Sequence, residues 1–154
     1  MDIQCTDKKT FELIKGSQKL GKLTYESLFS FKAHLQVENN TYKIAPKGLF
    51  STQISVSQND TEIASMKITF HGGIALTFAN GKEFILKAKG VFHANYILED
   101  ENQQQLLVLH PDFKWTKLSY NYSVSYDQPQ DPLLVLLTTY AANYYIAVMS
   151  SSIY

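Results

Sequence analysis

Apolar and polar residues alternate along most of the first 126 residues of the chain. Residues 31–37 show the pattern most clearly, because Phe-Lys-Ala-His-Leu-Gln-Val places every apolar side chain at an odd position. A period of two sends alternate side chains to opposite faces of a strand. Similar runs recur at roughly 8–12-residue spacing between turn-forming Gly, Pro, Asn and Asp, which is typical of an antiparallel barrel or sandwich.

The alternation predicts about eleven or twelve strands between residues 10 and 126. Residues 1–9 are expected to form a polar, loose start. Asn80-Gly81 predicts a tight type I′ hairpin turn, since both residues tolerate positive φ, and His110-Pro111-Asp112 is expected to break a strand. The predicted strands are 11–15, 20–26, 31–37, 41–45, 50–57, 62–70, 74–79, 82–88, 91–98, 105–109 and one or two within 113–126.

The pattern changes at residues 131–152. From Leu133 to Met149 there is no charged residue, no Gly and no Pro. Asp131 is a strong N-cap residue, and Pro132 would occupy the first helical position, where its missing N–H costs nothing. The run is too long for a strand, and its Leu and Ala residues favour a helix. A helix is therefore predicted over about residues 132–150.

The predicted helix is apolar on all sides apart from a thin line formed by Thr139, Asn143 and Ser150. Such a helix is buried, either in protein or in lipid. Seventeen residues span roughly 26 Å, slightly less than the bilayer core of about 30 Å. The nearest upstream Lys is the distant Lys117, so the expected positive flank is missing. Burial inside the protein is the preferred interpretation, and a membrane tail anchor is the alternative.

Many strands followed by one wholly apolar helix predict a particular packing. A barrel of about eight strands is filled by its own side chains, whereas a wider one leaves a lumen. A helix about 10 Å across would fill that lumen. The expected fold is mainly β: a closed antiparallel barrel of about 11–12 strands around a central hydrophobic C-terminal helix, forming one domain over residues 1–154. The side chains expected to form the helix core are Leu133, Leu134, Leu136, Leu137, Tyr140, Tyr144, Ile146 and Val148.

Composition narrows the functional classes. The formal charge is zero, and all 14 basic residues are Lys. Twelve of these Lys lie in residues 1–90 with eight acids, and two lie in residues 91–154 with six acids. Without Arg the chain lacks the planar fork that favours phosphate recognition, and without a concentrated basic face nucleic-acid binding is not expected. A single Cys5 and no visible secretory signal predict a reducing, cytoplasmic location.

The strand series from Phe11 to Tyr126, followed by Asp-Pro-Leu-Leu-Val-Leu-Leu at 131–137, resembles the tubby-like superfamily. That superfamily includes the tubby C-terminal domain, the phospholipid scramblases and the LURP-one-related proteins, which share a twelve-stranded barrel closed around a hydrophobic helix. The likeness is one of pattern and order over nearly the whole chain. The palmitoylated cysteine run of scramblases is not matched by the lone Cys5.

The resemblance implies binding of anionic phospholipid head groups by basic residues. The residues available for such contacts are Lys43, Lys47, Lys87, Lys89, Lys114 and Lys117. The expected partners are therefore a phospholipid surface, which would place the chain peripherally on a membrane, or a protein. The chain itself is not expected to cross the membrane.

No catalytic or cofactor motif stands out. His34, His71, His93 and His110 lack short metal-ligand spacing. Residues 99–101, Glu-Asp-Glu, lack the alternating spacing of a calcium loop. A non-catalytic binding or scaffold module that acts through its outer surface, without cofactor or metal, is the leading hypothesis. The alternatives are a tail-anchored protein with a soluble β domain and a small-ligand carrier barrel with an outer helix.

Overall fold

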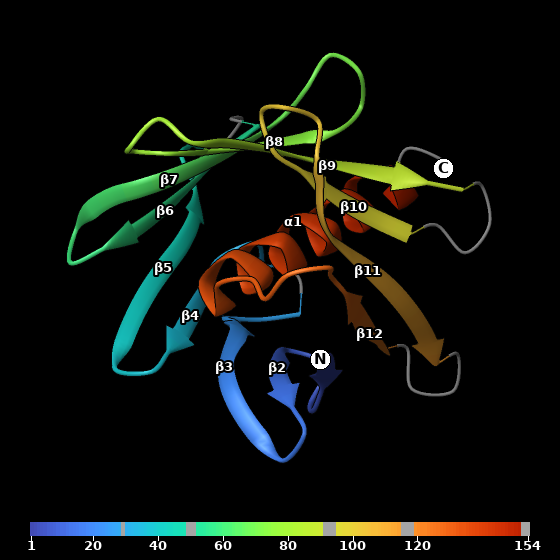
Figure 1. Cartoon of the computed structure of the whole chain (residues 1–154). Coiled ribbons are helices and arrows are strands. Elements are labelled where there is room, and N and C mark those ends of the chain that lie inside the picture. Colours follow the sequence, from blue (N-terminus) through green and yellow to red (C-terminus); the bar gives the residue numbers. More distant parts are fainter. Residues whose placement is uncertain (29, 49–51, 91–94, 115–118, 152–154) are drawn as a thin grey trace.

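Twelve antiparallel strands form a closed barrel, and the single C-terminal helix runs inside it (Figure 1). The computed structural model describes residues 1–28, 30–48, 52–90, 95–114 and 119–151. Each strand pairs with its neighbours in sequence, and β1 pairs with β12 to complete the ring. The strands are β1 Asp2–Cys5, β2 Thr10–Lys15, β3 Gln18–Tyr25, β4 Ala33–Val37, β5 Asn40–Pro46, β6 Gln53–Gln58, β7 Thr61–Ile68, β8 Ile74–Phe78, β9 Glu83–Lys89, β10 Asn95–Glu99, β11 Gln105–Lys114 and β12 Ser119–Ser125, and the helix is α1 Pro132–Ser151.

The alternation of side chains along the strands separates the barrel interior from its outer wall. In β4, Ala33, Leu35 and Val37 are buried, while the residues between them are exposed. The same pattern places an apolar face of every strand toward the helix. The mainly β barrel with a C-terminal helix, predicted from the period of two and the apolar run, is confirmed.

The helix begins as the sequence predicts. The Asp131 carboxylate accepts a hydrogen bond from the Leu133 backbone N–H at 3.0 Å, and the Asp131 carbonyl accepts one from Val135 N–H at 3.1 Å. This is N-cap geometry with Pro132 at the first helical position. The middle of the helix is enclosed by strands: Val135, Leu136, Leu137 and other residues up to Asn143 are buried.

Two expectations about strand limits are wrong. The first residues are not a loose start, because Asp2–Cys5 is a strand that pairs with both β2 and β12. Residues 110–112 do not break β11, which continues to Lys114. Leu109 is the last residue of β11 that pairs with β10. Pro111 lies beyond it and pairs with Tyr122 of β12. Position 111 thus has a partner strand on one side alone, and proline is tolerated at such edge positions of a sheet.

The type I′ prediction at Asn80-Gly81 is also wrong. Positive φ occurs at Gly81 (94°) but not at Asn80, and Gly81 N–H donates to the Phe78 carbonyl at 2.9 Å. The turn is thus one residue longer, with glycine in the left-handed position at its end. Positive φ at two successive central residues, as in a type I′ turn, is found instead at Asn59 (51°) and Asp60 (65°).

Because neighbouring strands are antiparallel, their connections alternate between the two ends of the barrel. We call one end the loop end; it carries the β1–β2, β3–β4, β5–β6 and β7–β8 connections and the C-terminal end of α1. We call the other the hairpin end; it carries short turns such as Gly16-Ser17 and Asn59-Asp60, and the segment leading into α1. Within the part of the chain that the structure describes, no helix is both long and apolar enough to span a bilayer.

Candidate functional site

The exposed large apolar side chains gather at the loop end. Leu28 is 59% exposed, Phe31 is 36% exposed, and both lie in the β3–β4 connection. Ile68 ends β7 and is 37% exposed, and Phe70 in the following turn is fully exposed. Of the exposed large apolar residues that the structure describes, Ile85 alone lies on the barrel wall, in β9. The two pairs lie on connections that are four strands apart in the ring but at the same end of the barrel, so both can contact one broad surface.

Charge is distributed unevenly between the two ends. The described connections of the loop end carry Lys8, Lys9, Lys32 and Lys47, against Asp7 and Glu26. Among the described residues, neither Lys8 nor Lys32 forms an ion pair, whereas Lys47 Nζ lies 2.9 Å from the Glu62 carboxylate. The loop end therefore combines apolar side chains with a positive balance.

The hairpin end has the opposite character. Its only described Lys in a connection is Lys82, and its acids are Glu38, Asp60, Asp100, Glu101, Asp127 and Asp131. No exposed large apolar side chain lies in its described connections. The molecule is thus polarised along the barrel axis, although its formal net charge is zero.

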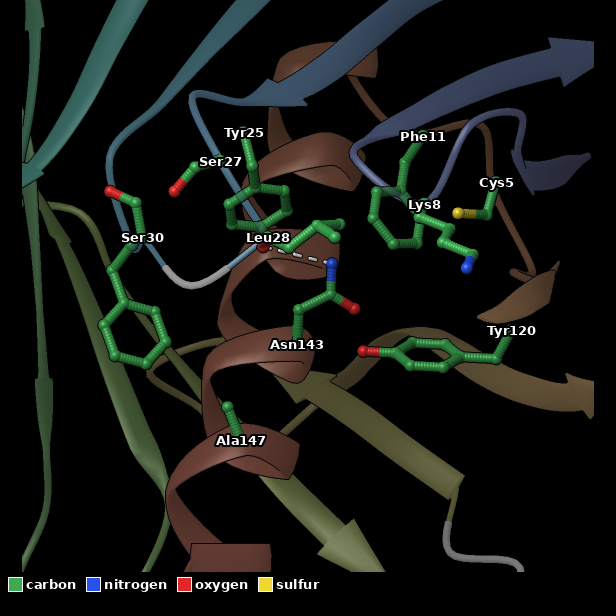
Figure 2. A pocket seen from close by; sticks show the side chains of 11 residues that line it. Cys5, Lys8, Phe11, Tyr25, Ser27, Leu28, Ser30, Tyr120, Asn143 and Ala147 are labelled. Atoms are coloured by element: carbon green, nitrogen blue, oxygen red, sulfur yellow. Dashed lines mark hydrogen bonds between the residues drawn. The ribbon is translucent and has the colours of Figure 1, made fainter. Parts of the chain in front are cut away.

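A pocket of about 150 Å³ opens at the loop end, beside the emerging helix. Figure 2 shows its side chains converging from the β1–β2 turn, the β3–β4 connection, β12 and the helix. Aromatic and aliphatic groups form most of the wall, and Lys8 lies at one side of it. The lining residues are Cys5, Lys8, Phe11, Tyr25, Ser27, Leu28, Ser30, Phe31, Tyr120, Asn143 and Ala147.

Asn143 organises the floor of this pocket. Its Nδ2 donates to the Tyr25 hydroxyl at 3.1 Å, and its Oδ1 accepts from the Tyr122 hydroxyl at 2.6 Å. Tyr120 and Tyr122 are also hydrogen-bonded to each other. Within the described residues, no buried side-chain nitrogen or oxygen lacks a hydrogen-bond partner. The polar floor is therefore satisfied by the protein itself.

The β3–β4 connection is attached to the helix on its inner side. The Tyr140 hydroxyl donates to the Phe31 carbonyl at 2.7 Å, and the Phe31 ring packs against Tyr144 with ring centroids 4.8 Å apart. At its base, Glu26 N–H donates to the Lys32 carbonyl at 2.9 Å. These contacts fix the connection from which Leu28 and Phe31 reach the pocket.

Burial changes the acidity of the groups around the pocket. Desolvation raises the pKa of the Cys5 thiol, although the backbone N–H of Lys8 opposes this shift. Desolvation also raises the pKa of Tyr120 to about 12 and raises the pKa of Tyr25 and of Tyr122 well above the usual value. All four groups are neutral near pH 7, so they contribute to an uncharged lining.

The structure separates the six Lys that the tubby-like resemblance pointed to. Lys43 is exposed on the outer wall in β5, whereas Lys87 and Lys89 lie in β9, four strands further round the ring. Lys87 Nζ lies 2.8 Å from the Glu99 carboxylate. It also lines a hollow of about 500 Å³ with Thr69, His71, Gly72, Gly73, Ile85, Ala88, Gln103 and Tyr145.

The remaining members of that set are less defined. Lys47 is the ion-paired loop-end residue described above, and Lys89 is the exposed last residue of β9, at the loop end. Lys114 ends β11, but its side chain lies outside the described residues, as does the whole of Lys117. Their role as head-group contacts stays a prediction.

The residues expected to form the helix core face the interior to different degrees. Leu134, Leu136, Leu137 and Tyr140 are buried. Three others, Leu133, Tyr144 and Ile146, are partly buried and pack against the core, and Val148 is half-buried near the loop end. The helix thus becomes less enclosed as it leaves the barrel at the loop end.

His110 takes part in a polar chain on the outer wall. Its Nδ1 lies 3.1 Å from Asn95 Oδ1 and its Nε2 lies 3.0 Å from the Ser125 hydroxyl. The order serine, histidine, amide is that of an activated nucleophile, but none of the three residues lines the pocket or the hollow described above. A cross-strand ladder between β10, β11 and β12 accounts for these contacts.

The other ionisable residues considered from the sequence lie apart. His34 is on the outer wall 3.5 Å from Glu26, His71 is in the β7–β8 turn, and His93 lies outside the described residues. Asp100 closes its turn by accepting hydrogen bonds from the N–H groups of Asn102 and Gln104. No group of three or more His, Cys, Asp or Glu side chains that could hold a metal ion is found within the described ranges.

Comparison with known proteins adds no relative: no protein-family model, no curated protein and no solved structure matches this chain. The class that the structure itself defines is a closed twelve-stranded antiparallel barrel with one C-terminal helix inside it.

The hydrophobic pattern of the sequence did not single out Leu28, Ile68 or Phe70 as candidate site residues. Leu28 interrupts the polar composition expected of a connection, whereas Ile68 and Phe70 continue the alternation of the predicted strand 62–70 and so resemble inward-facing strand positions.

Proposed function

We propose that this chain is a non-catalytic barrel module that docks its loop end on an anionic phospholipid surface. The observation that carries this proposal is the coincidence of exposed Leu28, Phe31, Ile68 and Phe70 with a positive balance of Lys at one end of the barrel. Apolar side chains enter the boundary between head groups and acyl chains, and Lys attracts anionic lipids. The acidic hairpin end would then face away from the membrane.

A tubby-like relationship supports the same proposal. The predicted superfamily has the same arrangement of twelve strands closed around a C-terminal hydrophobic helix, and its tubby members bind phosphoinositide head groups. The proposal differs from the outer-wall contacts of the sequence hypothesis, because it places lipid binding at one end of the barrel. Of the six-Lys set, Lys47 and Lys89 are the members at this end whose side chains the structure describes.

The magnitudes are those of reversible peripheral binding. Burying one large apolar side chain contributes about 1.5–3 kcal/mol, and each Lys near an anionic surface contributes about 1 kcal/mol. A few such residues give weak but measurable attachment, as for a protein with a partial membrane anchor. The helix occupies the lumen, and this favours binding at the end of the barrel over a carrier function of its interior.

Co-sedimentation with vesicles tests the proposal. Vesicles of phosphatidylcholine with phosphatidylserine should bind the protein at low salt, binding should weaken at high salt, and vesicles of phosphatidylcholine alone should bind much less. No sedimentation with the anionic vesicles at either salt concentration would remove the proposal. In that case the exposed surface is left to a protein partner, which a pull-down with the purified chain would seek.

Matched variants locate the binding surface. Ile68 and Ile85 are both 37% exposed, but Ile68 ends β7 at the loop end, whereas Ile85 lies on the outer wall in β9, beside Gly73 of the β7–β8 connection. Ile68→Ser should therefore weaken vesicle binding more than Ile85→Ser does. Phe70→Ser should weaken it further, about ten-fold or more, because a fully exposed ring is lost. Equal losses from Ile68→Ser and Ile85→Ser would contradict docking through the loop end.

The charged residues offer a second matched pair. Lys32→Gln at the loop end should weaken binding to anionic vesicles about five-fold, and Lys82→Gln at the hairpin end should have little effect. The two substitutions remove the same charge from the same residue type. A larger loss from Lys82→Gln would reverse the proposed orientation of the barrel.

A further inference from the structure

We infer that the 150 Å³ pocket at the loop end binds the hydrocarbon group of an anionic amphiphile, with the acidic head group next to Lys8. The inference goes beyond membrane docking, because it assigns a defined cavity to one molecule and requires no bilayer. The shared chemistry is a short hydrocarbon chain next to a carboxylate or a phosphate. A free fatty acid and the acyl chain of a phospholipid are two sources of that chemistry.

The size of the pocket limits the part of the ligand that it can enclose. A cavity of about 150 Å³ accommodates a group of about six carbon atoms. Longer chains would extend beyond it, over the exposed Leu28 and Phe31 side chains at the rim. The pocket thus fits the end of a chain or a short acid rather than a complete lipid.

The wall suits hydrocarbon. Phe11 packs edge-on against Tyr25 with ring centroids 6.1 Å apart and against Tyr120 at 6.0 Å, so aromatic rings border one side. The Cys5 thiol stays protonated, since burial raises its pKa, and a neutral thiol behaves as a small apolar group. Leu28, Phe31 and Ala147 complete the apolar lining.

The polar floor does not oppose an apolar occupant. Asn143 Oδ1 accepts a hydrogen bond from the Tyr122 hydroxyl, and its Nδ2 donates one to the Tyr25 hydroxyl. A buried polar group that already has its partners loses little when water leaves. The floor can therefore be covered by a methyl or methylene group without leaving Asn143 Oδ1 unpaired.

The charge at the rim selects the head group. Lys8 lines the pocket and is exposed, and within the described residues it forms no ion pair. The nearby acid Asp7 is directed to its own turn, where its carboxylate accepts hydrogen bonds from Lys9 N–H and Thr10 N–H. An ammonium group beside an apolar cavity complements an acidic amphiphile and disfavours a cationic one.

The first test uses soluble ligands and the complete chain, followed by ¹⁵N–¹H NMR. Hexanoate is the probe, hexylammonium has the same chain with the opposite charge, and acetate has the same head group without the chain. Hexanoate should shift the Asn143 side-chain amide and the Cys5 and Lys8 backbone amides in a saturable manner. Acetate should not saturate, and hexylammonium should bind several-fold more weakly. Absence of saturable shifts with hexanoate, or equal binding of hexylammonium, would overturn the inference.

Substitutions then place the ligand in the pocket. Ala147→Trp should fill the cavity and abolish hexanoate binding. Lys8→Asn should weaken binding about five-fold or more, whereas Lys9→Asn should not, because Lys9 does not line the pocket. Asparagine tolerates the positive φ of 70° at Lys8. Folding is checked by the unchanged amide spectrum of the barrel, and unchanged hexanoate binding by folded Ala147→Trp would refute the location.

A second arm separates the two sources of the ligand. Dihexanoylphosphatidylserine, used as a monomer in solution, offers the same chain on a phospholipid. If this lipid competes with hexanoate and binds more tightly than hexanoate does, phospholipid is the preferred source. If hexanoate binds and the lipid does not compete, the free acid is the source. Because neither ligand forms a bilayer here, failure of vesicle docking and failure of pocket binding are separate results.

Discussion

The Tyr122 hydroxyl donates a 2.6 Å hydrogen bond to Asn143 Oδ1 and so connects strand β12 of the barrel to the helix α1 inside it. Both residues are buried, with Tyr122 1% and Asn143 7% exposed. The same Asn143 donates to Tyr25 of β3. One amide in an otherwise apolar helix thus fixes the rotation of the helix relative to two strands.

Asn143→Leu should destabilise the protein. The change removes the partner of Tyr122 and of Tyr25, and a buried polar group left without its partner costs about 1–3 kcal/mol. Chemical denaturation measures the difference in free energy of unfolding. Thr139→Val is the control, because the Thr139 hydroxyl bonds only to the Val135 carbonyl of its own helix, at 2.9 Å. The explanation fails if both variants lose the same stability.

Removal of the helix should prevent folding. A chain ending at Gln130 lacks Val135, Leu136, Leu137 and Tyr140, which are each 0% exposed. Each such side chain contributes about 1.5–3 kcal/mol, and the whole stability of a domain is about 5–15 kcal/mol. Circular dichroism should show no cooperative thermal transition for the truncated chain. A soluble product with a sharp transition would show that the strands do not need the helix.

Gly21 should be intolerant of a side chain. A Cβ at this position would lie 2.7 Å from the Gln36 carbonyl and 2.9 Å from Leu136 Cδ1. Overpacking of this kind costs about 1–3 kcal/mol, so Gly21→Ala should lower the denaturation midpoint. Gly16→Asn is a suitable comparison, since no atom lies within 4 Å of a Cβ there and asparagine tolerates the positive φ. Equal effects would argue against close contact of β3 with the helix.

Alkaline pH should unfold the barrel. Burial raises the pKa of Tyr25, Tyr120, Tyr122 and Tyr140, with that of Tyr120 near 12, whereas an unfolded tyrosine titrates at about 10. The neutral phenols stabilise the folded state below the unfolded pKa, and this stability is lost as the pH rises through the folded values. Tyrosinate absorbance should therefore rise together with loss of circular dichroism. Titration of all tyrosines near pH 10 with the fold intact would contradict their burial.

Two hairpin turns give an opposite pair of effects. Asp60 has φ of +65°, which suits glycine better than aspartate, so Asp60→Gly should stabilise the protein by up to about 1 kcal/mol. Asn80 has no positive φ, so Asn80→Gly should cost about 0.4–1 kcal/mol by loosening the unfolded chain. Thermal denaturation of the two variants measures both. The turn assignment is wrong if the signs are reversed.

The sequence predicts the fold well because its strongest signals are local. The N-cap of Asp131, the apolar run after Pro132 and the alternation in β4 are each determined by neighbouring residues. Strand β1 was missed because Ile3 is its only fully buried side chain and its pairing with β12 is about 120 residues distant in sequence. The site was not predictable from spacing, since Cys5, Tyr25, Tyr120 and Asn143 meet only when the ring closes.

The pairing of β1 with β12 also determines how the protein can assemble. The two strands that complete the ring come from opposite ends of the chain, and α1 follows both. During synthesis β1 must therefore wait, with one unpaired edge, until β12 and α1 have left the ribosome. Such long-range pairing is slow, so the twenty residues of α1 determine when, and around what, the ring closes.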